Sequence, residues 1–393
     1  MKTQGSAGAA KCVGRVGTAP LAAVLAAITV LLASGPAHQA DAYRFYPVQG
    51  AGRIPGIAEA RLWSAASWGP GDTLVWRISD NSHWSHRFGS AEDAVPTIRK
   101  ALEAWSDIPT ADISWEVGAV ADIDEARESE YVSIDPDSET GGYARWRGNR
   151  DRITDCRVFL GSWVAREPPK WWRELDEEDP YRKYPALGVL IHEFGHCLGL
   201  RHSNELPGVA GITVRDRYLA EQRRYRHVFA ESSDVAPRDP QMSYGWSDYG
   251  LEYPLTHDDI VGASLLRPAR NWTRGTGSIS GQVLLDGRPL SYAHVWAFGD
   301  GSARGLPNAV GAFSNGQGDF LIEGLTPGAY SLWVSSMGSR SAHFGLVGQS
   351  APIDLAETFL PSPVVVTARE TTEGVQLHAR RGRDCRRPAP CGR

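Results

Sequence analysis

His192-Glu193-Phe194-Gly195-His196-Cys197-Leu198-Gly199-Leu200-Arg201-His202-Ser203 is the stretch that decides the fold of the first half of the chain. His192 and His196 are four residues apart, so on a helix their imidazoles project from the same face, one turn apart. Two imidazoles placed in this way suit one Zn²⁺ ion. Gly199 lets the chain leave the helix in a conformation that most residues avoid, and that turn would return His202 as a third ligand.

The number of ligands indicates what kind of zinc site this would be. Three protein ligands leave one coordination position open for water, as a catalytic rather than a structural zinc site requires. Glu193 follows the first ligand directly, so its carboxylate would reach that water without being a ligand itself.

A second segment, Pro240-Gln241-Met242-Ser243-Tyr244-Gly245-Trp246, lies downstream of the motif. Together the two segments resemble the metzincins, a clan of zinc endopeptidases in which a tight turn carries a methionine beneath the zinc histidines. The resemblance covers about Trp63 to Pro268 and implies that Met242 lies under the zinc site, with a plain core methionine as the alternative. We expect Asp258 or Asp259, at the start of the final helix, to brace this turn.

The resemblance points to more than one metzincin family. Ser203 and the helix expected over Leu255–Leu266 are similar to matrixins. Tyr244 is instead similar to a tyrosine of serralysins and astacins that contacts the zinc or the oxyanion, which makes it a candidate catalytic residue, with a structural tyrosine as the alternative. No histidine occurs between Gly118 and Leu160, so the second, structural zinc of matrixins is not expected and we predict one catalytic ion.

These features predict a zinc metalloendopeptidase that acts on protein or peptide substrates, with Glu193 as the general base for the attacking water. A strand at the edge of a sheet, over Gly141–Trp146, would bind the substrate by main-chain hydrogen bonds. Two alternatives stay open. One is a catalytically silent, secreted binding or adhesion protein that retains the zinc fold, and the other is a metalloenzyme that cleaves something other than a peptide.

The N-terminus reads as a targeting segment. Basic residues such as Lys2 and Arg15 precede an apolar run, Leu21–Ala33, and Ala40-Asp41-Ala42 offers a cleavage site. The run is too short to cross a bilayer as a helix, although an uncleaved anchor is the alternative. No later stretch is apolar enough to span a membrane, so we expect a secreted or periplasmic protein.

Four cysteines would remain after cleavage, and an even number in an exported chain suggests disulfides. Cys385 and Cys391 are close in sequence and would close a small loop. Cys156 and Cys197 would then pair and tie a strand to the zinc helix. The alternative for Cys197 is a buried free thiol.

Hydrophobic periodicity predicts the secondary structure of the first half. Alternation over Thr73–Ser79 indicates a strand, and Ser90 can cap a helix that runs to Asp107. Pro185 suits the first turn of the zinc helix, where a missing N–H costs nothing. We further expect strands at Ile113–Val117 and Arg157–Leu160, and a helix at Leu255–Leu266 capped by Thr256.

Past Pro268 the composition changes to short apolar runs with glycine and proline between them. This pattern predicts an all-β sandwich, with Asp286-Gly287 as a hairpin turn. Gly281-x-Val283 and Gly324-Leu325-Thr326-Pro327-Gly328-Ala329-Tyr330 resemble the carboxypeptidase regulatory-like, transthyretin-like domain. A contact with a surface or a polysaccharide through this domain is one expectation for its role.

The predicted fold class is therefore α+β. By resemblance, a metzincin domain with a mixed twisted sheet, a zinc helix and a C-terminal helix precedes the all-β sandwich. The expected organisation is a signal peptide at 1–42, an N-terminal arm at 43–62, the zinc peptidase domain at 63–268, a linker at 269–276, the sandwich at 277–368 and an Arg-rich flexible tail at 369–393.

Composition limits the classes of partner that we expect. A hydrophobic content of 42% and a charged content of 22% are ordinary for a globular protein, and a net charge of −5 gives no reason to expect nucleic acid. The acidic segment Ala121–Glu139 has two readings. Hard carboxylates suit Ca²⁺, which would add a second metal, whereas a solvated acidic loop needs no ion.

Overall fold

The computed structural model describes residues 71–81, 83–84, 88–124, 127–138, 141–149, 152–161, 185–200, 241–242, 255–291, 293–299, 308–335, 355–356 and 358–381. Internal contacts divide the chain into two units, Met1–His38 and Gln39–Arg393. The expected signal peptide lies outside the described residues, and everything below belongs to the second unit. That unit is α+β, as predicted. None of the described helices is long and apolar enough to cross a membrane.

A mixed five-stranded sheet forms the first half, with strand order β2-β1-β3-β5-β4. Four strands are parallel and β4 is antiparallel to β5, so β4 is a rim strand among the described strands. The strands are β1 Thr73–Ser79, β2 Ser114–Ala121, β3 Tyr131–Asp135, β4 Gly142–Asn149 and β5 Arg152–Gly161.

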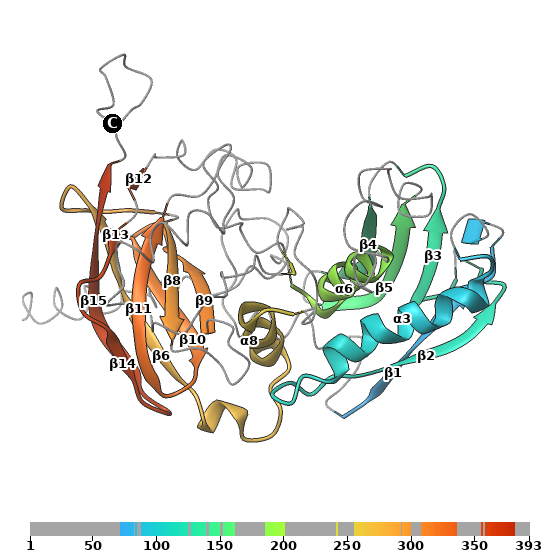
Figure 1. Cartoon of the computed structure of the whole chain (residues 1–393), viewed down its shortest axis with the longest axis horizontal. Helices are drawn as coiled ribbons and strands as arrows, with labels where there is room; N and C mark the ends of the chain where they lie inside the picture. Colours follow the sequence, from blue (N-terminus) through green and yellow to red (C-terminus); the bar gives the residue numbers. More distant parts are fainter. Residues whose placement is uncertain are drawn as a thin grey trace, which may run out of the picture. The chain divides into compact units, whose positions relative to one another are not determined.

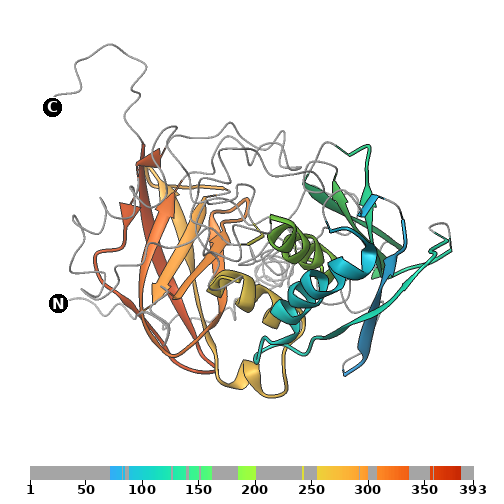
Figure 2. The same cartoon turned by 45° about the vertical axis from the view of Figure 1, so that its right-hand side comes forward.

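Two helices pack together against this sheet, α3 (Ala91–Ser106) and α6 (Pro185–Leu198). Both views show them side by side (Figures 1 and 2). Ser90 caps α3 as predicted, because its side chain accepts a hydrogen bond from the Asp93 N–H. The Trp105 indole of α3 donates to the Ile191 carbonyl of α6 at 2.9 Å, which fixes the register between the helices.

A third helix, α8 (His257–Leu266), follows, and its capping box confirms the predicted cap at Thr256. The Thr256 side chain accepts from the Asp259 N–H, and the Asp259 carboxylate accepts from the Thr256 N–H at 2.8 Å. Most of α8 is buried, including both of its acidic residues. A short 3₁₀ turn, η2 (Trp272–Arg274), leads from α8 into the strands beyond.

The remainder is all β, in two five-stranded sheets. One has the order β10-β6-β15-β12 with β7 beside β6, and the other has the order β13-β11-β8-β9 with β14 beside β11. Val283, Val295 and Leu332 lie in one shared core, so the two sheets pack face to face. The strands are β6 Gly277–Leu285, β7 Arg288–Pro289, β8 His294–Gly299, β9 Asn308–Phe313, β10 Asp319–Leu325, β11 Gly328–Ser335, β12 Leu355–Ala356, β13 Thr358–Phe359, β14 Val364–Val366 and β15 Thr371–Arg381.

The structure differs from the predicted C-terminal tail. Thr371–Arg381, expected to be flexible, is strand β15 and pairs in parallel with β6. Only two of its side chains, Leu377 and Ala379, are fully buried. The apolar alternation is therefore too short to predict a strand within this Arg-rich sequence. The strand is stabilised mainly by pairing with β6 on one side and β12 on the other. Residues 382–393 lie outside the described part of the chain.

Candidate metal centre

Helix α6 carries His192 and His196 on one face, as their spacing predicts. The two imidazole centroids are 4.7 Å apart and the ring planes meet at 87°. Both side chains are buried. Two imidazoles held this close, with their planes crossed, are a suitable pair of ligands for one tetrahedral ion.

Backbone carbonyls fix the orientation of both rings. The Nδ1 atom of His192 lies 2.7 Å from the Gln241 carbonyl, and Nδ1 of His196 lies 2.8 Å from the Leu200 carbonyl. Because a carbonyl only accepts, each Nδ1 carries the hydrogen, which leaves Nε2 as the atom that can ligate a metal when the ring is neutral. Burial lowers the pKa of His192 to about 4, so this ring is neutral near pH 7.

Gly199 ends α6 and helps to build the second of these contacts. It has a φ of 109°, which favours glycine. The Gly199 N–H donates to the His196 carbonyl and the Leu200 N–H donates to the Gly195 carbonyl, each at 3.0 Å, which is a complete Schellman motif. The turn brings the Leu200 carbonyl back onto His196. The predicted helix end is confirmed. The sequence did not predict that the Leu200 carbonyl orients His196, because a backbone carbonyl has no sequence signature.

Glu193 lies between α6 and the rim strand β4. It is buried, and burial raises the pKa of its carboxyl to about 8, while a hydrogen bond with the Ala144 backbone lowers that pKa in part. Gly142 allows β4 to come this close, because a Cβ there would lie 3.3 Å from Glu193 Cγ and would collide with Val189. The expected strand at Gly141–Trp146 thus exists and lies beside the candidate base.

Met242 packs directly on α6. A Cβ at Gly195, midway between the histidines, would collide with the Met242 sulfur and lie 2.8 Å from the Trp105 ring. Asp259 holds the turn, since its carboxylate accepts from the Gln241 N–H at 2.8 Å and from the Met242 N–H at 3.1 Å. Of the two aspartates proposed as the brace, Asp259 is therefore the one.

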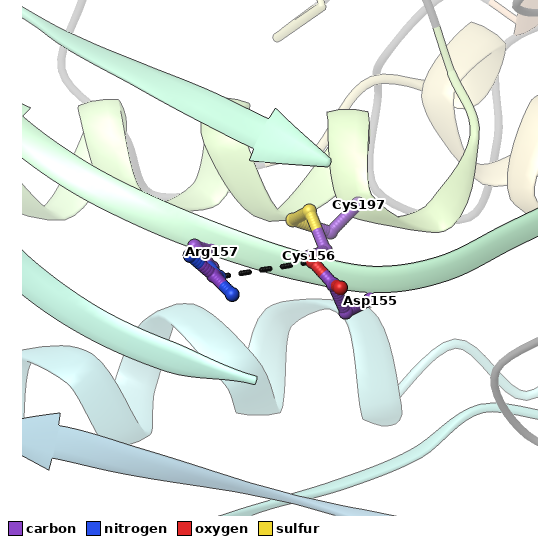
Figure 3. A network of polar contacts seen from close by, with 4 residues as sticks. All are labelled: Asp155, Cys156, Arg157 and Cys197. Atoms are coloured by element: carbon purple, nitrogen blue, oxygen red, sulfur yellow. Dashed lines mark ion pairs between the residues drawn. A yellow bond between two sulfur atoms is a disulfide. The ribbon is translucent and has the colours of Figure 1, made fainter. Parts of the chain in front are cut away.

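The predicted Cys156–Cys197 disulfide is present and joins β5 to α6, one residue after His196 (Figure 3). The Cα atoms are 5.6 Å apart. On the next residue of β5, Arg157 is buried and pairs with Asp155 at 3.7 Å. The disulfide therefore limits how far the end of α6 can move from the sheet.

Several predicted site residues lie outside the described residues: His202, Ser203, Tyr244, Cys385 and Cys391. Within the described part, no group of three or more His, Cys, Asp and Glu side chains is placed to hold a metal ion. The Ca²⁺ hypothesis for Ala121–Glu139 stays a prediction. In that segment, Asp135 accepts from the Tyr143 hydroxyl at 2.6 Å and from the Asp137 N–H.

Comparisons with known proteins bring no close relative. No family model and no curated protein matches the chain. Among solved structures, the Bacillus anthracis TIE protein matches at 16% identity and a TM-score of 0.19, over 27% of this chain and 17% of that one. GBS52, the minor pilin of Streptococcus agalactiae, matches at 17% identity and a TM-score of 0.18, over 30% of this chain and 49% of that one. This chain thus spans less than half of either structure.

These findings correct the family assignment. No family model matches the chain, neither one for metzincins nor one for carboxypeptidase regulatory-like domains, and the described residues do not assemble a three-ligand zinc group. The assignment to metzincins, with matrixin-like and serralysin- or astacin-like features, was wrong on this basis. The physical reason is that the motifs specify a local helix end and a turn, which the chain has, and such short pieces do not determine the family of a whole chain.

Proposed function

We propose that this chain is an exported zinc-dependent endopeptidase. The observation that carries the proposal is the group His192, His196 and Glu193 on one buried face of α6, beside the rim strand β4. Both histidines have their Nδ1 atoms held by carbonyls, which supports metal binding through Nε2.

The residues have distinct roles in this proposal. His192, His196 and His202 would hold Zn²⁺, which when bound supplies a Lewis acid and lowers the pKa of a water molecule. Glu193 would take the proton from the attacking water and deliver it to the leaving amine. To accept that proton Glu193 must start ionised, and the positive charge of a bound Zn²⁺ would favour ionisation of this carboxyl, whose pKa burial raises to about 8 in the metal-free protein. Tyr244 would donate a hydrogen bond to the developing oxyanion.

The rim strand suggests a peptide substrate. β4 is hydrogen-bonded to β5 on one side, and among the described strands it has no neighbour on the other. An extended peptide can add to such a rim through main-chain hydrogen bonds. Because the Ala144 backbone contacts Glu193, a peptide bound along β4 would pass next to the base. An extended peptide bound along a whole strand would be cleaved within its chain rather than at its ends.

Two observations support export. Disulfides persist in oxidising compartments, and the structure has one beside the site. The basic and apolar N-terminal sequence with an A-x-A site is typical of a secretory signal.

The test compares Glu193→Ala with Glu103→Ala, a control at an exposed glutamate of α3. We expect both proteins to bind about one Zn²⁺ per chain, as a three-histidine site implies. Glu103→Ala should cleave casein at the wild-type rate and Glu193→Ala should lose cleavage. Equal cleavage by the two variants would contradict the role of Glu193 as the general base. A wild-type protein that binds zinc but cleaves no unfolded substrate would favour the catalytically silent binding protein.

A further inference from the structure

Helix α8 carries two consecutive buried carboxylates that bond to different halves of the protein. Asp258 Oδ1 accepts from the Gly311 N–H of β9 at 2.9 Å. Asp259 accepts from the backbone of the turn at Gln241 and Met242. Both aspartates are almost fully buried, at 4% and 2% exposure, so each depends on donors supplied by the protein rather than by water.

The turn held by Asp259 orients a candidate ligand. The Gln241 carbonyl is the acceptor for His192 Nδ1, and the Gln241 side chain donates to the Gly188 carbonyl of α6 at 2.8 Å. Hydrogen bonds at Gly311, Gln241 and His192, joined by the backbone of α8 and of Gln241, therefore connect β9 to His192.

The segment predicted as a linker is fixed at both ends. The Ala269 N–H donates to the Thr110 carbonyl of the first half at 3.0 Å, and the Arg369 N–H donates to the Thr276 carbonyl at 2.7 Å. Between these bonds, Gly324 of β10 packs on α8 so closely that a Cβ there would collide with Val261 and lie 3.0 Å from the Trp272 ring. The β-rich half is therefore packed against α8 and is not joined to it only by a flexible linker.

We propose that the β-rich half acts as part of the candidate site, with Asp258 as a positioning residue that couples β9 to His192 through α8. Asp258 and Asp259 lie in the same helical turn, and Asp259 also closes the capping box at Thr256. A first turn that loses its contact with β9 loses the geometry that holds Gln241, and with it the acceptor for His192. The proposal rests on the proposed zinc site where zinc affinity is measured. Where hydrogen exchange is measured in the metal-free protein, it rests only on the hydrogen bonds described above.

The test uses the full-length protein and three substitutions. Asp258→Ala removes the acceptor for Gly311, Asp258→Asn retains an oxygen acceptor, and Ser264→Ala is the matched control. Ser264 lies on the same helix and is fully buried, and its hydroxyl bonds to Thr110 and the Ile260 carbonyl instead of to the Gln241 turn.

Two quantities are measured well below the unfolding temperature: zinc affinity by competition with a chelator, and hydrogen exchange of the Gln241 and Met242 amides in the metal-free protein. We expect Asp258→Ala to weaken zinc binding about tenfold, as loss of an outer positioning contact does, and to speed exchange of both amides by a similar factor. Asp258→Asn should retain most of the wild-type zinc affinity and most of the protection of the two amides. Ser264→Ala should lower stability without changing either.

Unchanged values in Asp258→Ala, or equal changes in Ser264→Ala, would overturn the coupling. Should Asp258→Ala not fold, Asp258→Ser gives the same comparison, because it keeps a polar side chain near the start of α8 that is shorter than the aspartate which reaches Gly311. Failure of the wild-type protein to bind zinc would refute the proposed site, and the exchange measurement would still decide the coupling.

Discussion

At the scale of single residues, Glu193 is a carboxyl that the fold removes almost completely from water. In the metal-free protein its pKa is raised from 4.5 to about 8, chiefly by burial. The folded protein therefore holds a proton that the unfolded chain releases. The resulting stabilisation is complete below pH 4.5 and is lost as the pH rises towards 8.

Glu193→Gln, which cannot titrate, removes this dependence. Relative to wild type, the metal-free variant should gain up to about 4 kcal/mol between pH 4.5 and pH 8. The titrations of His192 and His257, whose pKa values burial lowers to about 4, are common to both proteins and cancel. Urea denaturation with a chelator at the two pH values measures the gain. A stability difference that stays constant between them would show that Glu193 is not buried in the metal-free protein.

Residue spacing predicted the side chains of the site but not the atoms that orient them. His192, Glu193 and His196 follow from a helix period, and Gly199 follows from the need to end that helix. The carbonyls of Leu200 and Gln241 could not be foreseen, because every residue has a carbonyl and only the folded turn selects one.

At the scale of elements, periodicity worked where one face of an element is buried. Thr73–Ser79 and the helix after Ser90 were predicted at nearly their observed bounds. Tyr131–Asp135 was instead placed within an acidic segment, although it is a buried strand between β1 and β5. The acidic residues around it hide a short apolar run, and its burial comes from neighbours distant in sequence.

The contact between α6 and the methionine turn can be tested through Gly195. Gly195→Ala should improve helix propensity by about 1 kcal/mol, yet the added Cβ would meet Met242 and Trp105. We expect a net loss of about 1–3 kcal/mol in guanidinium denaturation, because packed interfaces resist added volume. Gly275→Ala is the control, since its Cβ would meet only the Trp272 carbonyl at 3.5 Å. A Gly195→Ala protein as stable as this control would contradict the close packing.

At the scale of the whole molecule, the sequence predicted the α+β class and a change to short strands near Pro268. It did not predict the family, because the motifs carry local geometry only. It also did not predict that the β-rich half is docked on α8. That contact depends on Gly311 and Gly324, and a glycine carries no sequence pattern that names its partner.

The docking can be tested with two glycines that have nearly the same φ. Gly324 has a φ of 73° and Gly287 a φ of 75°, so alanine at either position incurs a similar strain, about 1 kcal/mol. Only at Gly324 would the new Cβ also strike Val261 and Trp272, whereas at Gly287 nothing lies within 4 Å. Thermal unfolding followed by circular dichroism should show a loss about 1–3 kcal/mol larger for Gly324→Ala. Equal losses in the two variants would mean that the two halves are not packed at this point.

The bond between Asp258 and Gly311 also bears on how the protein behaves at high concentration. β9 is a rim strand among the described strands, and an uncovered rim is a template on which a strand of another molecule can pair. The Asp258 side chain on the Gly311 N–H occupies one of the donors that such pairing would need. The hydrogen bond between Gly311 and Asp258 thus also disfavours pairing of β9 with a strand of a second molecule.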